Sequence, residues 1–352
     1  TSNLKPNLSD GPFNVNNIQY RAANEDQAIL APGYAPDGSE IRWNSDTFTT
    51  NPYFTVNRFI NDVNRNRLIA ALSGKYNFNN WMYAQLRLGN DILYDKRKTV
   101  TPTGTAYYAG GMGGLDEQSN TRRSELNSDL LIGAKHDIIA KVLSFDISAG
   151  TNLRKNTYEY TKLFGGPFIV PYFYSYNNLS IKSSNYNYNS TETHSSYYAV
   201  DFSLRDYLTI TTTGRYDAYS TLPSDNRSIF TPSVSASLLF SDLVHIPSLD
   251  FGKLRLSYAQ TSGEPTDAYV TTQYYTTNYS INGVAIGSFS DSLPNLFLKP
   301  YTLTEMEAGT ELKFLNGRLG IDVAYFHRKT KNEIIKGDLD LATGFARRSR
   351  AG

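Results

Sequence analysis

Apolar and polar residues alternate along ten strand-length segments between Asn66 and Lys331. In one of these segments Leu86 and Leu88 fall on one face of an extended strand, and Arg87 falls on the other. A shift of one residue would exchange the two faces, so each segment specifies an apolar and a polar face. The pattern predicts strands at Leu68–Phe78, Trp81–Tyr94, Leu126–His136, Leu143–Arg154, Tyr198–Arg205, Leu208–Asp217, Ser233–Phe240, Leu254–Gln260, Thr304–Phe314 and Leu319–Arg328.

The connections between these segments are alternately short and long. Short links are predicted at Asn79-Asn80, Ile138–Lys141, Arg205-Asp206 and Asn316-Gly317, the last being a strong hairpin signal, and a longer but still modest link is predicted at Ser241–Phe251. Between the pairs, long links are predicted at Lys96–Asn120, Thr161–Thr193 and Thr261–Pro300, with a shorter one near Thr221–Asn226. Outer-membrane barrels have short periplasmic turns and long extracellular loops, whereas both ends of a soluble β-sandwich face water. The asymmetry therefore favours an all-β, antiparallel transmembrane β-barrel.

The composition agrees with a barrel. Aromatic residues make up 13% of the chain, with 27 Tyr and 18 Phe, and charged residues make up 19%. Tyr and Trp gather where an apolar band meets lipid headgroups. Trp81, Tyr83 and Tyr76 lie beside one predicted turn, as such a girdle requires. Aromatic packing in a soluble all-β core is the alternative interpretation. The sequence contains no run of 18 apolar residues, so we expect no membrane-spanning helix.

The sequence gives little support for catalysis. The four histidines, at positions 136, 194, 245 and 327, have no metal-ligand spacing, and the chain has no cysteine. The glycine run Gly110–Gly114 lacks the lysine of a phosphate-binding loop. The formal net charge of +1 gives no reason to expect a nucleic-acid partner. We therefore predict no enzymatic activity, no cofactor and no metal site.

Several short stretches carry a resemblance to a known family, and their order along the chain is more specific than any one of them. They are Asn51-Pro52-Tyr53, Asn64-Arg65-Asn66-Arg67, Leu72-Ser73-Gly74-Lys75-Tyr76, Asp206-Tyr207-Leu208, Gly214-Arg215-Tyr216-Asp217, Pro232-Ser233-Val234-Ser235-Ala236, Lys253–Gly263 and Asn316-Gly317-Arg318-Leu319. In this order they resemble the middle of the barrel in SusC/RagA-type TonB-dependent outer-membrane transporters.

The resemblance implies a 22-stranded barrel occluded by an N-terminal plug and energised by the TonB complex through that plug. It also implies a SusD-like surface lipoprotein that helps to capture glycans or peptides. We recognise neither plug nor TonB box here, and ten strands would leave two unpaired edges in lipid, at several kcal/mol for each unpaired backbone group. We therefore expect about ten strands of a larger barrel. Residues 1–65 are expected to form an extracellular loop and lead-in, residues 66–331 the barrel portion, and residues 332–352 an extracellular loop. The remaining strands would belong to the same polypeptide or to another chain.

Polar residues on alternate strand positions are expected to face the barrel lumen. There they would be solvated wall charges, contacts of the plug, or contacts of a passing substrate. Glu305, Glu307 and Glu311 have the spacing of paired catalytic carboxylates, but a polar lumen supplies the same spacing. The predicted lumen wall is Arg87, Asp91, Asp129, Asp146, Arg215, Asp217, Arg255, Glu305, Glu307 and Glu311.

Aromatic residues in the predicted loops are the candidate ligand-binding groups. Flat rings beside hydroxyl and amide groups suit sugar faces or peptide side chains. The alternative is that they pack against other loops or against a capping partner. The candidates are Tyr107, Tyr108, Tyr172, Phe173, Tyr174, Tyr176, Tyr274 and Tyr275.

The sequence thus predicts part of a TonB-dependent transporter, integral to the bacterial outer membrane and in contact with its lipids. Its substrate would be an oligosaccharide or a peptide, and its partner a SusD-like lipoprotein. Two alternatives stay open. One is a soluble or surface-anchored β-rich carbohydrate-binding or adhesion protein, and the other is a passive porin, which would lack the plug.

Overall fold

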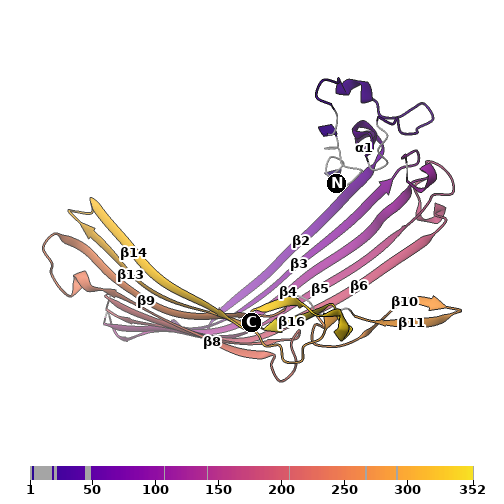
Figure 1. Cartoon of the computed structure of the whole chain (residues 1–352). Helices are drawn as coiled ribbons and strands as arrows, with labels where there is room; N and C mark the ends of the chain where they lie inside the picture. Colours follow the sequence, from indigo (N-terminus) through magenta and orange to yellow (C-terminus); the bar gives the residue numbers. More distant parts are fainter. Residues whose placement is uncertain are drawn as a thin grey trace. The chain divides into compact units, whose positions relative to one another are not determined.

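A computed structural model of the chain describes residues 2–3, 18–19, 22–43, 49–106, 108–140, 142–205, 207–265, 268–290 and 292–351. Ten long strands dominate these residues, and each matches one predicted segment (Figure 1). The ten strands are β2 (Ile60–Asn77), β3 (Met82–Thr101), β4 (Gly114–Ile139), β5 (Leu143–Gly165), β6 (Lys182–Leu204), β7 (Leu208–Tyr219), β8 (Ser228–Leu239), β9 (Leu249–Gly263), β13 (Tyr301–Phe314) and β14 (Leu319–Lys331).

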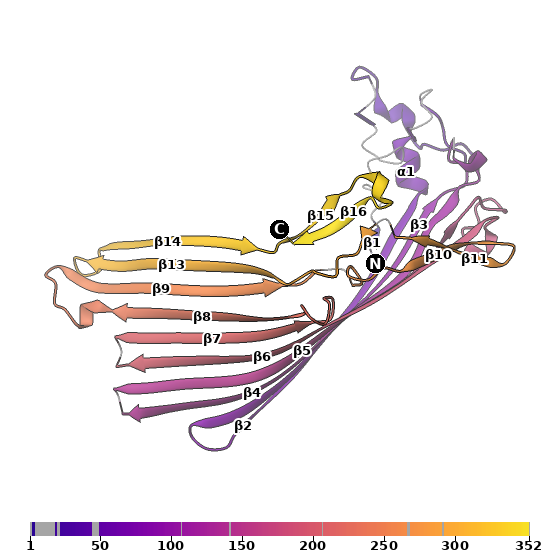
Figure 2. The ribbon, with the colours of Figure 1, turned by 60° about the horizontal axis from the view of Figure 1, so that its bottom comes forward.

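These strands follow one another in a single sheet, in the order β2 to β9, then β13 and β14. A two-residue strand, β1 (Ser2–Asn3), pairs with β2 and brings the described sheet to eleven strands. Figure 2 shows β13 and β14 lying beside β9, although β9 and β13 are separated in sequence. The antiparallel all-β fold predicted from the alternation is confirmed.

Short elements fill the connections and the chain ends. Strands β10 (Tyr275–Ile281) and β11 (Val284–Phe289) form a hairpin, and β12 (Ser292–Leu293), β15 (Ile334–Asp338) and β16 (Arg347–Ala351) form a small sheet. The helical elements are α1 (Pro52–Arg58) and single turns at Gln27–Leu30, Ala109–Gly111, Tyr176–Asn178, Phe240–Asp242 and Leu341–Thr343. None of the described helices is long and apolar enough to cross a bilayer.

The long connections are shorter than the sequence suggested in two places. Strands β3 and β4 leave only residues 102–113 between them, and β5 and β6 leave only 166–181. Much of Lys96–Asn120 and Thr161–Thr193 is therefore strand, and the predicted loop bounds were wrong there. The strand ends are rich in Ser, Thr, Asn and Tyr, so they lack the apolar face on which the prediction depended. Short and long connections alternate along the rest of the described sheet, but not around β8, where residues 220–227 and 240–248 form links of similar length.

The tight turn between β13 and β14 shows why an Asn-Gly pair predicts a hairpin. Leu315, Asn316 and Gly317 have φ values of 60°, 58° and 77°, in the left-handed region that asparagine and glycine tolerate best. The amide of Gly317 donates a hydrogen bond to Oδ2 of Asp250 at 3.1 Å. This contact joins the turn to the start of β9. Lys141 and Asp206, which belong to two other predicted short links, lie outside the described residues.

The chain divides into two compact units. The first comprises residues 1–69, 91–124 and 157–189, and contains the lead-in segment, α1 and two of the long connections. Its core consists of buried side chains from β3, β4 and the connection after β5, namely Val100, Leu115, Phe168 and Leu179. Tyr174 and Tyr176 pack against this core.

Asn51 anchors the lead-in segment of the first unit. Its side-chain oxygen accepts a hydrogen bond from the amide of Tyr53 at 3.0 Å, which caps α1, and Pro52 occupies the first helical position. Its side-chain nitrogen donates to the carbonyls of Leu30 and Ile41, at 3.1 and 3.0 Å. One buried side chain thus fixes the start of the helix and two segments that precede it.

The second unit comprises residues 70–90, 125–156 and 190–352 and contains the two-faced part of the sheet. Residues directly opposite in an antiparallel pair lie on the same face. Tyr197 lies opposite Arg215, and Arg215 lies opposite Thr231, which defines a polar face. On the other face, Met306 and Val323 have exposed fractions of 55% and 57%. A sheet face that exposes large apolar side chains suits lipid.

Candidate functional site

The polar face of the second unit carries a pocket of about 420 Å³. Side chains from the consecutive strands β4 to β9 line it, because alternate positions of each strand face the same side. Three residues of the predicted lumen wall, Asp129, Arg215 and Asp217, come together here. The full lining is Asn127, Asp129, Asn152, Arg154, Thr193, Tyr197, Arg215, Asp217, Tyr219, Thr231, Thr261 and Ser262.

Asp217 is the most enclosed charge in this pocket, with 7% of its side chain exposed. Its Oδ1 accepts hydrogen bonds from Nε of Arg215 at 2.7 Å and from the hydroxyl of Ser195 at 2.5 Å. Arg215 Nη2 in turn donates to the Ser195 hydroxyl at 2.7 Å. Arg215 precedes Asp217 by two residues on β7, and Ser195 lies opposite Asp217 on β6. The three side chains therefore form a closed, charge-neutral triangle.

Asp129 on β4 is the second carboxylate of the pocket. The Tyr197 hydroxyl donates to its Oδ2 at 2.7 Å, and Arg87 Nε lies 3.7 Å from its Oδ1. This Oδ1 is buried and accepts no hydrogen bond from the described residues. Gly150 makes room for the Tyr197 ring, because a Cβ at Gly150 would lie 2.6 Å from it. This carboxylate oxygen is therefore buried beside Arg87 without a hydrogen-bond donor from the described residues.

Glu264 closes one side of this group of residues. It lies just after β9 and accepts hydrogen bonds from the hydroxyls of Thr193, at 3.2 Å, and Thr221. Arg154 Nη2 lies 3.9 Å from it. The sequence analysis missed Glu264, because it falls in a predicted loop and the hydrophobic pattern carries no signal there. Ser195 and Tyr197 were also missed as site residues, because they lie on β6 before Tyr198, where the predicted strand segment began.

Four more residues of the predicted wall form separate ion pairs. Asp91 binds Arg67 at 2.5 Å, Arg255 binds Asp322 at 2.8 Å, and Glu305 binds Arg328 at 2.5 Å. Glu311 lies 3.4 Å from Lys313, which neighbours it along β13. Glu305 and Glu311 thus have different cationic partners, an arrangement that offers no acid and base directed at one substrate. Asp146 and Glu307 lie on β5 and β13, and neither lines this pocket.

Three of the loop aromatics pack within the first unit. The Tyr172 hydroxyl donates to the carbonyl of Asp37, and its amide donates to the Thr103 hydroxyl at 3.1 Å. Tyr174 lies with its ring centroid 5.3 Å from that of Phe168, and Tyr176 packs on the same core. These contacts are the loop packing that the sequence analysis gave as the alternative to ligand binding.

The other loop aromatics differ in their exposure. Tyr108 is half-buried, and burial and the nearby Asp116 raise the pKa of its hydroxyl. Phe173 has an exposed fraction of 58%. In the second unit Tyr274 is exposed, and Tyr275 pairs its ring with Phe289 across the β10–β11 hairpin, at 4.4 Å between centroids. Tyr107 lies outside the described residues. A ligand-binding role for these aromatics stays a prediction.

A second hollow, of about 600 Å³, lies in the first unit beside Glu40, Thr103 and Tyr172. Glu40 Oε1 accepts from the amide of Asn51 at 2.6 Å, and Oε2 accepts from the amide of Ala106 at 2.8 Å. Burial nevertheless raises the pKa of Glu40. This carboxylate therefore holds the lead-in segment to the connection between β3 and β4.

The two-faced antiparallel sheet and its short turns are typical of part of an outer-membrane β-barrel. The family model described as "TonB dependent receptor-like, beta-barrel" matches residues 2–347, and the chain belongs to this family. Members of the family are integral to the bacterial outer membrane. The predicted family, fold and location are confirmed, and they contradict the soluble alternative.

This chain spans only part of the length of the relatives described here. TonB-dependent receptor P26 of Formosa agariphila is 27% identical over 153 residues, which cover 42% of this chain and 15% of the relative. The structure of the RagAB peptide transporter is similar to this chain, with a TM-score of 0.76 and 16% sequence identity. The match covers 89% of this chain and 36% of the RagAB chain. The structure of the RagAB peptide importer in the "closed-closed" state has a TM-score of 0.75 and 16% sequence identity, over 91% of this chain and 36% of the RagAB chain. At this identity the two structures show the shared fold alone.

Proposed function

We propose that this chain forms part of the lumen wall of a TonB-dependent transporter that imports peptides or oligosaccharides with a SusD-like surface lipoprotein. The carrying observation is the polar pocket on the wall, in which an unsatisfied carboxylate oxygen of Asp129 lies among donors from neighbouring strands. In this proposal residues 1–65 and 332–352 are extracellular, and residues 66–331 form the barrel portion.

The pocket offers donors and acceptors to one ligand. The Asn152 amide donates to Asn127 at 2.9 Å, which leaves the Asn127 amide nitrogen directed to other partners. Arg215 and Arg87 bind carboxylates on one edge while about half of each side chain stays exposed. Asp129 supplies a carboxylate, whose Oδ2 already accepts a hydrogen bond from the Tyr197 hydroxyl. A peptide backbone, with its N–H and C=O groups, matches such a mixed surface, and so do sugar hydroxyls.

Peptides are the first candidate substrate. The two RagAB structures that share this fold are named a peptide transporter and a peptide importer. The pocket also carries arginines and carboxylates together, and this pairing complements the opposite charges of a short peptide's termini. The same chemistry fits a plug segment that rests against the wall until substrate binds.

Oligosaccharides are the second candidate, because exposed rings occur in the long connections. Phe173 is exposed in the first unit, and the paired rings of Tyr275 and Phe289 offer an apolar surface on the β10–β11 hairpin. Rings of this kind stack on sugar faces.

The test uses the full-length transporter and its lipoprotein partner in the outer membrane of a host that cannot import the probes. Uptake of a radiolabelled oligopeptide mixture and of radiolabelled oligosaccharides is measured with and without an active TonB complex. We expect TonB-dependent uptake of one class, and an Asp129→Asn variant with uptake reduced about tenfold, as for loss of a charged hydrogen bond. Ser237→Ala, on the same face near the turn rim, is the matched control.

Uptake that persists without TonB would indicate a passive porin. Uptake of neither class would reject both candidate substrates. Equal uptake by Asp129→Asn and wild type would contradict a role for the wall pocket in transport, but would not contradict transport itself.

A further inference from the structure

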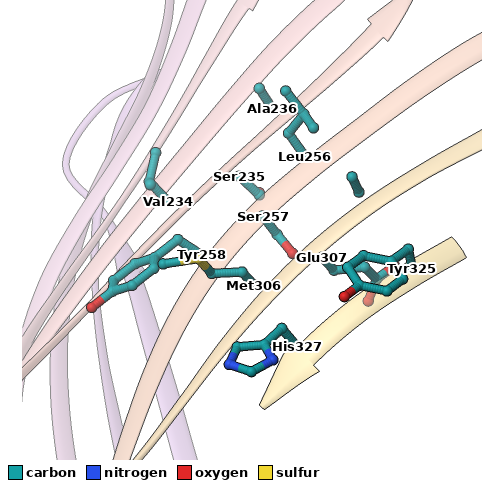
Figure 3. A pocket seen from close by; sticks show the side chains of 11 residues that line it. Val234, Ser235, Ala236, Leu256, Ser257, Tyr258, Met306, Glu307, Tyr325 and His327 are labelled. Carbon is teal, nitrogen blue, oxygen red and sulfur yellow. The ribbon is translucent and has the colours of Figure 1, made fainter. Parts of the chain in front are cut away.

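The apolar face of the second unit contains a groove of about 500 Å³ between β8 and β14. Figure 3 shows Val234, Tyr258, Met306 and His327 on neighbouring strands, with Ala236 and Leu256 close by. The strand register explains the hollow. Ala236, Leu256, Ala308 and Tyr325 form one row across the four strands, and the two alanines leave space beside the larger side chains.

Strand β14 indicates how the groove is oriented across the membrane. It begins at the tight turn after β13 and ends toward the long connections, which lie outside the cell in outer-membrane barrels. Its residues on this face are Leu319, Ile321, Val323, Tyr325, His327 and Lys329. The series changes from aliphatic to aromatic to basic in chain order, which is the order of hydrocarbon, interface and headgroup in the outer leaflet.

A polar row closes the extracellular end of the groove. Lys329 lies opposite Thr304, and Thr304 lies opposite Gln260, so an ammonium, a hydroxyl and an amide share one level of the sheet. This level is one row beyond Tyr258, Met306 and His327, about 7 Å along the strands. None of the three residues in the row is acidic. An anionic group held there would therefore meet donors and a positive charge without a competing carboxylate.

We infer that this groove binds one lipid of the outer leaflet, with an acyl chain between Leu256 and Tyr325 and a phosphate-bearing headgroup at Lys329. An acyl chain fits because the side chains that line the groove on this face are mostly apolar, while Ser235, Ser257 and Glu307 of the lining alternate with them along their strands, and hydrocarbon has no hydrogen-bonding groups to satisfy. A phosphate fits because its oxygens accept hydrogen bonds from all three side chains of the polar row. The inference rests on the family's place in the outer membrane and does not depend on the transported substrate.

The test is native mass spectrometry of the full-length transporter, purified in detergent and incubated with diphosphoryl lipid A. Dephosphorylated lipid A and phosphatidylethanolamine serve as comparison probes. We expect one diphosphoryl lipid A to be retained in preference to either comparison lipid. Lys329→Ala should weaken this retention about fivefold, the effect of one basic residue near a phosphate.

Ala308→Phe should abolish retention by filling the groove. Val200→Phe is its control, because Val200 lies on the same face and in the row of Tyr258, two strands beyond the groove. Lys253→Ala, on the opposite face, is the control for charge. Heat-modifiable migration in gels checks that every variant folds.

Three results would overturn the inference. One is equal retention of the phosphorylated and dephosphorylated lipid. Another is equal lipid retention by Ala308→Phe and Val200→Phe. The third is a wild-type transporter that forms a dimer and an Ala308→Phe variant that is monomeric but keeps its lipid. This result would assign the groove to a contact with a second copy of the chain.

Discussion

The two units of this chain differ in where many of their large apolar side chains lie. The first unit contains a buried core, in which Phe54 and Phe168 have exposed fractions of 0% and 1%, although Phe173 in one of its connections is exposed. The second unit exposes Met306 and Val323 on one face of its sheet, while its charges pair on the other. Burial against protein is the rule for a core surrounded by water, whereas a sheet face made mainly of exposed aliphatic side chains is typical of a surface that meets lipid. One polypeptide is thus built for two solvents.

The largest expected effect is a cavity in the first unit. Phe168→Ala should lower the stability of this unit by about 3–5 kcal/mol, because the core around Val100 and Leu179 cannot collapse onto the space. Hydrogen exchange of the full-length protein measures it as faster exchange at residues 166–181. Phe202→Ala, on the exposed apolar face, is the control and should change exchange little. Equal effects of the two variants would contradict the distinction between the units.

An arginine placed on either face of β14 tests the second unit. Val323→Arg should destabilise the barrel by about 2–4 kcal/mol, because a charge would enter the hydrocarbon region. Ala324→Arg, one residue along and on the polar face, should cost little. Folding into lipid vesicles at increasing urea, followed by gel migration, reports both values. If Ala324→Arg proved the more harmful, the assignment of the faces would be reversed.

The hydrogen bond between Tyr197 and Asp129 tests whether contacts on the polar face of the second unit stabilise the sheet. Tyr197→Phe and Asp129→Asn should show a coupling of about 1–2 kcal/mol in a double-mutant cycle, as hydrogen bonds to charged groups do. The same urea unfolding measures it. A matched cycle on the exposed pair Arg255 and Asp322 should give less than about 1 kcal/mol. A coupling near zero for Tyr197 and Asp129 would mean that this contact does not organise the wall.

The smallest expected effect concerns pH in the first unit. Burial raises the pKa of Glu40 above its ordinary value of 4.5, so the folded state holds this proton to higher pH than the unfolded state does. The contribution of Glu40 to stability therefore falls as pH rises from 4.5 toward the raised pKa. Hydrogen exchange at Asn51 and Ala106, corrected for intrinsic rates, should show this decline. Glu40→Gln should remove it, and an unchanged slope in that variant would assign the effect to another group.

The predictable part of the fold is the part where one side of each strand meets lipid. Alternation located all ten long strands, and the Asn316-Gly317 pair located a hairpin, because both signals are local. The core of the first unit was missed, since Phe54, Val100 and Phe168 come from distant segments without shared periodicity. The small sheet of β12, β15 and β16 was missed for the same reason.

The candidate site was only partly predictable. The charged members Asp129, Arg215 and Asp217 follow from strand parity, which places alternate residues on one face. Their grouping into one pocket depends on the register between strands, which a single strand does not specify. Asp91, Arg255 and Glu305 follow from the same parity yet form separate ion pairs. Strand parity assigns residues to a face, and register decides which of them meet.

Strand β9 and its neighbours are expected to present one face to lipid and the other to water. The most direct test places single cysteines at Leu256 and Ser257 of the full-length transporter in lipid vesicles, each labelled with an environment-sensitive fluorophore. Nitroxide-bearing lipids should quench the label at position 256, and a water-soluble quencher should act at position 257. Quenching of both labels by the same reagent, or the reverse pattern, would contradict the account.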